Sequence, residues 1–159
     1  MSHDHRKEID MFSPSELNVI NHAAAIIKSK AKKDPVVFSS ADNVKNYLKF
    51  SLVTNDREVF KVLLLDTQHR LLKDINLFMG TIDSAAVYPR EVLKVALKEN
   101  AAAIILSHNH PSGIPEPSQA DIAITAKIKA ALDIIDIRLL DHFVVGTEGT
   151  VSLAERGLI

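Results

Sequence analysis

Hydrophobic residues recur with helical spacing in the first part of the chain. In FSPSEL, Ser13 can cap a helix that has Pro14 in its first position and Glu16 in its first turn. The apolar face of this helix consists of Leu17, Ile20, Ala24 and Ile27. The pattern predicts a helix as far as about Lys32, followed by the break DPVVFSS and a second helix through NVKNYLKF that Ser40 can cap.

The pattern then changes to short apolar runs. EVFKVLLLD and LLKDINLFMG predict two strands of a hairpin around the turn-like stretch DTQHR, and PREVLKVALKEN predicts a helix. AAAIILS, residues 101–107, is too short and too apolar for a surface helix and predicts a strand buried on both faces. A helix from about Ser118 to Ile135, a strand in IRLLDHFVVG and a hairpin ending in TVSL complete a mixed α/β fold. The pattern does not distinguish a parallel sheet from a mixed one.

Composition narrows the class of protein. The 159 residues suit one domain, and 47% hydrophobic with 25% charged residues is typical of a globular protein. A formal charge of −1 disfavours a broad nucleic-acid surface, and the basic cluster KSKAKK is expected to be a solvated helix end. The polar N-terminus and the lack of a long apolar stretch predict a cytoplasmic protein without a membrane partner. With no cysteine in the chain, a metal ion would need nitrogen and oxygen ligands.

The stretch SHNHPSGIPEPSQAD combines side chains that can bind such a metal. His108 and His110 are two residues apart at a strand end, so both rings can project from one face. Asp121 falls in the first turn of the next helix. It lies three residues before Ile124, which belongs to the apolar face of this helix that is expected to pack against the sheet. Two imidazoles and a carboxylate are the protein ligands of many catalytic zinc sites. Ser118-x-x-Asp121 can equally be a variant capping box, and capping does not exclude ligation.

The spacing of these residues carries a family resemblance. His108-x-His110, seven residues, Ser118, two residues and Asp121 match the JAMM motif of the JAB/MPN metalloprotease superfamily. HNHPSGIPEPSQAD and the upstream IDSAAVYPREVLKVALKENAAAIILS resemble the bacterial RadC family in particular. The resemblance implies one Zn²⁺ per chain, held by His108, His110 and Asp121, with Ser118 close to the scissile carbonyl.

The resemblance also implies a domain division and a fold. Residues 37–159 are expected to form the RadC-like JAB/MPN domain, a cytidine-deaminase-like α/β fold with a mixed sheet flanked by helices. Residues 1–36 are expected to form an N-terminal helical extension. Full-length RadC proteins have a further N-terminal helical region of the type associated with DNA contact, so a short, stand-alone RadC-like protein is predicted.

JAMM enzymes use an upstream glutamate before an apolar strand as general base, and Glu58 is the candidate here. The typical pattern has glycine three residues later, where this chain has Lys61. Glu91 is the rival by position, although an acid is common in the first turn of a helix. His142 could orient a metal ligand, but a partly buried strand histidine is expected.

The resemblance and the motif together favour a zinc metallopeptidase or isopeptidase with an unidentified peptide or protein substrate. The alternatives are a DNA-associated RadC-like protein, acting in repair or as a metal-dependent nuclease, and an interaction module with an idle site. The sequence leaves the oligomeric state open.

Overall fold

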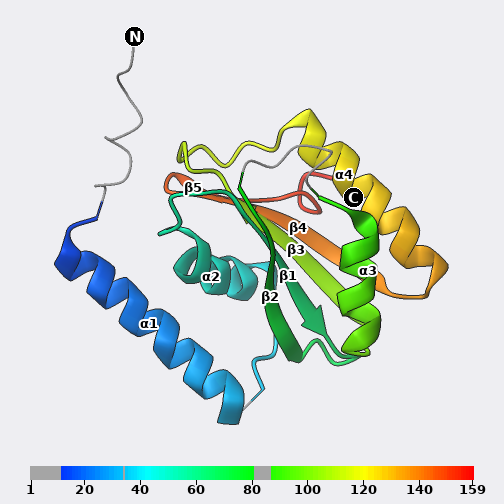
Figure 1. The fold of residues 1–159 in the computed structure, drawn as a ribbon, viewed down its shortest axis with the longest axis horizontal. Helices are drawn as coiled ribbons and strands as arrows, with labels where there is room; N and C mark the ends of the chain where they lie inside the picture. The colour runs from blue at the N-terminus through cyan, green and yellow to red at the C-terminus, as the bar shows by residue number, and fades with distance from the viewer. Residues whose placement is uncertain (1–11, 34, 81–86) are drawn as a thin grey trace.

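A computed structural model describes residues 12–33, 35–80 and 87–159 of the chain (Figure 1). In chain order the elements are α1 (Pro14–Lys33), α2 (Ala41–Leu52), β1 (Val59–Leu65), β2 (Leu71–Met79), α3 (Pro89–Lys98), β3 (Ala103–Asn109), α4 (Gln119–Ile134), β4 (Arg138–Gly146) and β5 (Gly149–Ser152). Each of these helices and strands was predicted from the sequence pattern, so the predicted α/β class is confirmed.

The described strands form one sheet in the order β2-β1-β3-β4-β5. Strand β1 is antiparallel to both β2 and β3, β3 is parallel to β4, and β4 is antiparallel to β5. The sheet is therefore mixed, which the sequence pattern had left open. The parallel pair needs a crossover, and α4 provides it by running between the end of β3 and the start of β4.

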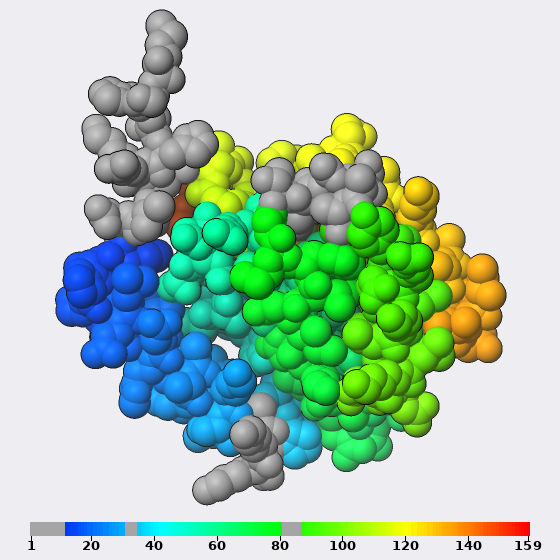
Figure 2. Space-filling view, in the orientation of Figure 1, coloured from blue at the N-terminus to red at the C-terminus, as the bar shows by residue number. Residues whose placement is uncertain are grey.

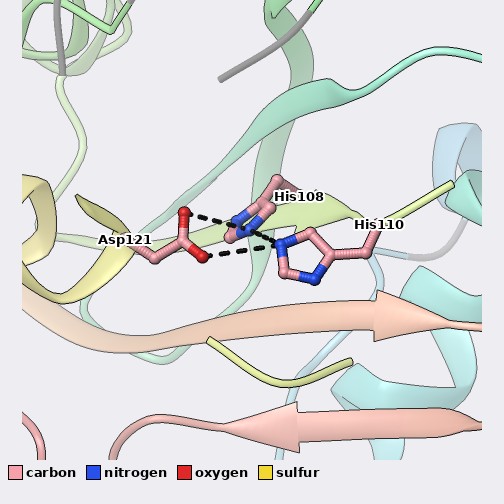
Figure 3. Close-up of side chains that lie close together, drawn as sticks. All are labelled: His108, His110 and Asp121. Atoms are coloured by element: carbon pink, nitrogen blue, oxygen red, sulfur yellow. Dashed lines mark hydrogen bonds and ion pairs between the residues drawn. The ribbon is translucent and has the colours of Figure 1, made fainter. Parts of the chain in front are cut away.

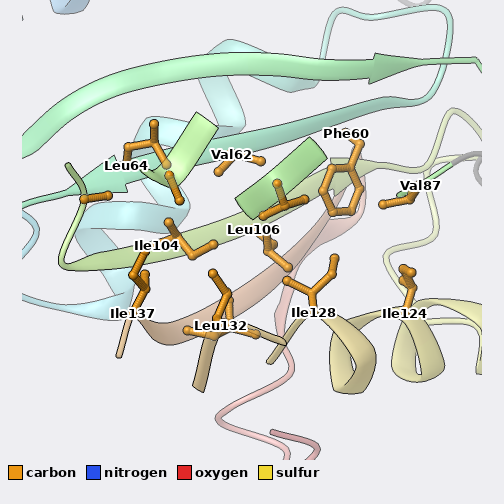
Figure 4. Close-up of a cluster of buried hydrophobic side chains, with 14 residues drawn as sticks. Phe60, Val62, Leu64, Val87, Ile104, Leu106, Ile124, Ile128, Leu132 and Ile137 are labelled. Carbon is orange, nitrogen blue, oxygen red and sulfur yellow. The ribbon is translucent and has the colours of Figure 1, made fainter. Parts of the chain in front are cut away.

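Helices cover both faces of this sheet and bury two cores. The core on the face of α3 and α4 contains Phe60, Val62, Leu64, Ile104, Leu106, Ile124, Ile128 and Leu132, among others (Figure 4). The core on the face of α2 contains Val44, Leu48, Leu52, Val59, Leu63, Leu65, Ile105, Phe143 and Val145, among others. Strands β1 and β3 are buried along their whole length, because apolar side chains on both of their faces meet helices.

Helix α1 lies along one side of the molecule next to α2 and forms a separate stripe on its surface (Figures 1 and 2). The predicted start of this helix is confirmed, because Ser13 N donates to Glu16 Oε2 at 2.7 Å and Glu16 N donates to Ser13 Oγ at 3.3 Å. In the KSKAKK cluster, Lys28 and Lys30 are exposed. The side chains of Lys32 and Lys33 lie outside the described residues.

Within the described ranges of the chain, no helix combines the length and the apolar content needed to cross a bilayer.

Strand β3 extends two residues beyond its predicted end at Ser107. His108 and Asn109 continue the ladder, because His108 pairs with Phe60 of β1 and with Val144 of β4. The first histidine of the motif is therefore part of the central sheet, where neighbouring strands hold its backbone on both sides.

Lys61 stands where the JAMM pattern has glycine. Because its neighbour Phe60 pairs with His108, Lys61 points to the other face of the sheet, the one that α2 covers. Lys61 is 5% exposed, and its ammonium group pairs with the carboxylate of Asp74. That carboxylate also accepts a 2.6 Å hydrogen bond from the Tyr47 hydroxyl. Burial and the neighbouring Asp74 carboxylate raise the pKa of Tyr47, so its phenol remains a donor. The departure from the pattern thus changes the α2 side of the sheet and leaves the histidine side unaltered.

Candidate metal centre

The topology brings three segments together at one end of the central strands β1 and β3. Strand β1 begins where its antiparallel neighbour β3 ends, with Phe60 opposite His108. The chain then passes through His110 and a loop to the first turn of α4. This turn lies at the same end of the strands, because α4 is the crossover that follows β3. The start of β1, the end of β3 and the start of α4 can therefore contribute side chains to one site.

His108, His110 and Asp121 converge at this point (Figure 3). The two Nε2 atoms are 3.0 Å apart, His108 Nε2 lies 3.3 Å from Asp121 Oδ1, and His110 Nε2 lies 3.5 Å from Asp121 Oδ2. Tetrahedral zinc with bonds of about 2.0–2.2 Å places its ligand atoms about 3.3–3.6 Å apart. The two distances to the carboxylate fall in this range and the distance between the two Nε2 atoms is slightly shorter, so the three donors lie close to the spacing around a single zinc ion.

Asp121 has a capping role as well as a position in this cluster. Ser118 N donates to Asp121 Oδ2 at 2.8 Å, and Asp121 N donates to Ser118 Oγ at 3.1 Å, which is a complete capping box. The other carboxylate oxygen, Oδ1, faces His108. The cap and the metal cluster are thus compatible, and the cap holds the carboxylate in the orientation that a metal would need.

The electrostatics of the cluster favour a cation. His108 is completely buried and Asp121 is 2% exposed. Burial acts to raise the pKa of Asp121, but the interactions with the neighbouring rings of His108 and His110 outweigh it and hold that pKa well below its usual range. The neighbouring Asp121 carboxylate raises the pKa of His110 against the opposing effect of burial. The anionic carboxylate thus favours a positive charge between the three side chains.

The ring of His110 is oriented by the loop that follows it. Its Nδ1 lies 3.0 Å from the carbonyl oxygen of Ile114, which can only accept, so Nδ1 carries the proton and Nε2 presents its lone pair to the cluster. The loop is itself tied to β4, since His110 N donates to Val145 O at 2.8 Å. Gly113 has φ +91° and lies so close to Thr147 that a Cβ atom would be 2.5 Å from its hydroxyl, so only glycine fits this turn.

Glu58 lies beside the cluster, with its Oε1 3.9 Å from His110 Nε2. It directly precedes β1 and lies two residues before Phe60, which pairs with His108. The rival acid, Glu91, sits on α3, where it pairs with Arg90 and Lys94. The structure therefore places Glu58 next to the histidines, and it gives Glu91 partners on its own helix.

Asn109, between the two histidines, holds the backbone on either side of Glu58. Its Oδ1 accepts from Val59 N at 2.7 Å, and its Nδ2 donates to Arg57 O at 2.9 Å. The carbonyl of Glu58 itself accepts from Gly80 N at 2.8 Å. The motif thus links the candidate base to the candidate ligands through one buried amide. The sequence pattern gave no reason to single out this asparagine.

His142 lies on strand β4 as expected, but it is more deeply buried than the sequence suggested. His142 is fully buried, and its Nε2 lies 2.8 Å from Nδ1 of His108. Its other nitrogen, Nδ1, lies 2.6 Å from the hydroxyl oxygen of Thr125. Burial lowers the pKa of His142 well below its ordinary value, and the nearby His108 acts in the same direction. Sequence reasoning missed Thr125 altogether, although it lies four residues after Asp121 and hence on the same side of α4.

A cleft of about 580 Å³ opens beside His110. Its walls come from the segment before β1, the turn after β3, the end of β4 and the start of α1. Asp56 and Arg57 are the acidic and basic residues among its described lining, and the remainder is neutral, polar or apolar apart from His110. Of the three clustered side chains, His110 is the one that the described lining of the cleft contains, so the cleft adjoins one side of the cluster.

Comparisons with known proteins give one family model and a group of similar proteins. The sequence model described as "RadC-like JAB domain" matches residues 38–158. A UPF0758 protein of Marinomonas sp. (strain MWYL1) is 69% identical over 123 residues, which cover 77% of this chain and 55% of that protein. A UPF0758 protein of Methylibium petroleiphilum is 55% identical over 141 residues, covering 89% of this chain and 63% of that protein. A UPF0758 protein of Vibrio cholerae is 52% identical over 142 residues, covering 89% of each chain. The chain thus spans a little over half the length of the first two relatives.

Proposed function

Since this chain belongs to the family of RadC-like JAB domains, we propose that it is a zinc-dependent hydrolase that cleaves peptide or isopeptide bonds. The observation that supports this proposal most directly is the convergence of His108, His110 and Asp121, at zinc-ligand spacing, beside the carboxylate of Glu58. Three protein ligands leave a fourth position for water or substrate, which is the arrangement of catalytic rather than structural zinc.

When bound, zinc would act as a Lewis acid and lower the pKa of a coordinated water from about 15.7 to roughly 7. The remaining work falls to the protein. Glu58, whose Oε1 lies 3.9 Å from His110 Nε2, would serve as the base that takes up a proton from the water attacking the carbonyl carbon. The same carboxylic acid would then give the proton to the leaving amine as the carbon–nitrogen bond breaks.

Ser118 is suited to bind the carbonyl oxygen of the substrate. Its Oγ accepts a hydrogen bond from Asp121 N in the helix cap, so its own hydroxyl proton can be donated. The cap also keeps this hydroxyl one helical turn from a ligand of the metal. A donor in such a position stabilises the negative charge that develops on the oxygen during attack.

The charge of the cleft favours a polypeptide over a nucleic acid. A phosphodiester backbone is usually bound by several lysines and arginines. In the described lining of the cleft, Arg57 is next to Asp56 and the other residues add no further lysine or arginine. A nearly neutral cleft with polar and apolar patches suits a peptide backbone better, and the overall charge of −1 points the same way.

A cleavage screen tests the proposal. The zinc-loaded protein would be incubated with a peptide library, with isopeptide-linked peptides and with single- and double-stranded DNA, and products would be identified by mass spectrometry. We expect cleavage of peptide or isopeptide bonds that stops with a chelator, returns with zinc and is absent in Asp121→Ala. Cleavage of DNA alone would support the nuclease alternative. No cleavage of any substrate by a zinc-loaded, folded protein would support the idle interaction module.

A further inference from the structure

We propose that, at the zinc site proposed above, His142 and Thr125 are positioning residues that fix the ring tautomer of His108 so that its Nε2 presents a lone pair to the metal. His108 is the fully buried histidine of the cluster. Unlike His110, whose Nδ1 meets a backbone carbonyl directly, its Nδ1 faces another histidine ring. A hydrogen-bond partner beyond His142 must therefore determine which ring nitrogen of each histidine carries the proton.

A continuous row of short contacts leads from His108 to a fixed acceptor. Nδ1 of His108 lies 2.8 Å from Nε2 of His142, and Nδ1 of His142 lies 2.6 Å from Oγ1 of Thr125. Oγ1 of Thr125 lies 2.6 Å from the backbone carbonyl oxygen of Asp121. His108, His142 and Thr125 are each no more than 1% exposed.

The protons along this row can be assigned from the carbonyl end. A carbonyl oxygen can only accept, so the Thr125 hydroxyl proton points at Asp121 O, and Oγ1 must accept from Nδ1–H of His142. A neutral imidazole carries one N–H, so Nε2 of His142 is an acceptor and Nδ1 of His108 is its donor. Nε2 of His108 is then left without a proton, facing Asp121 and His110.

The opposite assignment of the protons, in which Thr125 donates to His142, is disfavoured by the short contact between Thr125 and the Asp121 carbonyl. If Thr125 donated to His142, two oxygens would lie 2.6 Å apart with no proton between them. Nε2 of His108 would then carry a proton and could not bind a metal. The distance between Thr125 and the Asp121 carbonyl therefore selects the direction that leaves Nε2 of His108 unprotonated. Nε2 of His108 then lies 3.0 Å from the unprotonated Nε2 of His110, a pair of acceptors that a metal ion between the two rings would satisfy.

The surroundings of the row keep water away from it. The ring of Phe60 is stacked on His108, with centroids 6.4 Å apart, and meets His142 edge to face at 5.6 Å. One helical turn of α4 supplies both the ligand Asp121 and the end of the row at Thr125. Outer hydrogen-bond partners of metal-ligating histidines commonly fix the tautomer in this manner, and their loss typically costs about 10–100-fold in metal affinity.

Two variants of one residue test the role. Thr125→Val keeps the shape of the side chain and removes the hydroxyl, whereas Thr125→Ser keeps the hydroxyl. Ile124→Val, at a buried neighbour on the same helix, controls for loosened packing. Zinc dissociation constants would be measured by competition with a chelator, and thermal unfolding would show that each variant is folded. The ring nitrogens of His108 in the metal-free protein would be assigned by ¹⁵N NMR at a pH where histidine is neutral.

We expect Thr125→Val to bind zinc about 10–100-fold more weakly, with Thr125→Ser within about threefold of the parent and Ile124→Val unchanged. In the metal-free parent, His108 should carry its proton on Nδ1. Equal zinc affinity in Thr125→Val and the parent would overturn the proposal, as would equal losses in all three variants or a proton on Nε2 of His108. A parent that binds no zinc but protonates Nδ1 of His108 would refute the proposed function and leave the tautomer assignment standing.

Discussion

Replacing His110 by alanine is expected to weaken zinc binding by at least about a hundredfold, because one of three protein ligands is lost. His110 suits this test since its side chain is 16% exposed and lies on the loop after β3, so its truncation leaves little empty space in the core. At a zinc concentration a hundred times the dissociation constant of the parent, binding should stabilise the parent by about 2.7 kcal/mol. Under the same conditions His110→Ala should gain no more than about 0.4 kcal/mol.

The matched control is His22→Ala, which removes an exposed histidine from α1, away from the cluster. Chelator competition and thermal unfolding with and without zinc measure both proteins. The control should bind zinc like the parent and gain the same stability. If His110→Ala and His22→Ala bound zinc equally well, His110 could not be a ligand and the metal would have to be sought elsewhere.

Replacing Glu58 by glutamine is expected to lower the cleavage rate by about 10²–10⁴-fold while zinc affinity stays near that of the parent. The glutamine side chain is nearly isosteric, but it cannot take up a proton at neutral pH. The backbone at this position is held by Asn109 and Gly80, so the substituted side chain should remain beside His110. Initial rates on a substrate found in the cleavage screen, with zinc content measured on the same samples, give the two quantities.

Glu91→Gln is the control for this prediction. It removes the same charge from the rival glutamate, which sits in the first turn of α3 and pairs with Arg90 and Lys94. This variant should cleave at nearly the rate of the parent. Full activity in Glu58→Gln, or a loss of activity only in Glu91→Gln, would assign the base to a different residue.

Local signals in the sequence were sufficient for the elements of the fold. Ser40 accepts the capping bond from Asn43, and Ser118 and Asp121 form their capping box, because such caps depend on residues three positions apart. Burial of β3 on both faces could likewise be anticipated from its unbroken apolar run. Pairing of strands depends on distant residues, so the mixed sheet and the extension of β3 to Asn109 became visible only in the folded chain.

The candidate site was likewise predictable only in part. Spacing alone placed His108, His110, Ser118 and Asp121 in one motif, and the structure brings the two histidines and the aspartate together. The roles of Asn109, Thr125 and His142 depend on contacts across 17 to 50 positions of sequence, as in the bonds from Thr125 to His142 and from Val59 to Asn109. A pattern within one short stretch cannot report such contacts, so the sequence around His142 predicts only an ordinary strand histidine.

The most direct test of the proposed metal centre is the metal content of the protein, measured by mass spectrometry after purification without added metal. The parent is compared with His108→Ala and Asp121→Ala, each shown to be folded by thermal unfolding. We predict close to one zinc ion per chain in the parent and almost none in either variant. A folded parent that takes up no metal even when zinc is offered would contradict the account, and the motif would then be a helix cap and a turn.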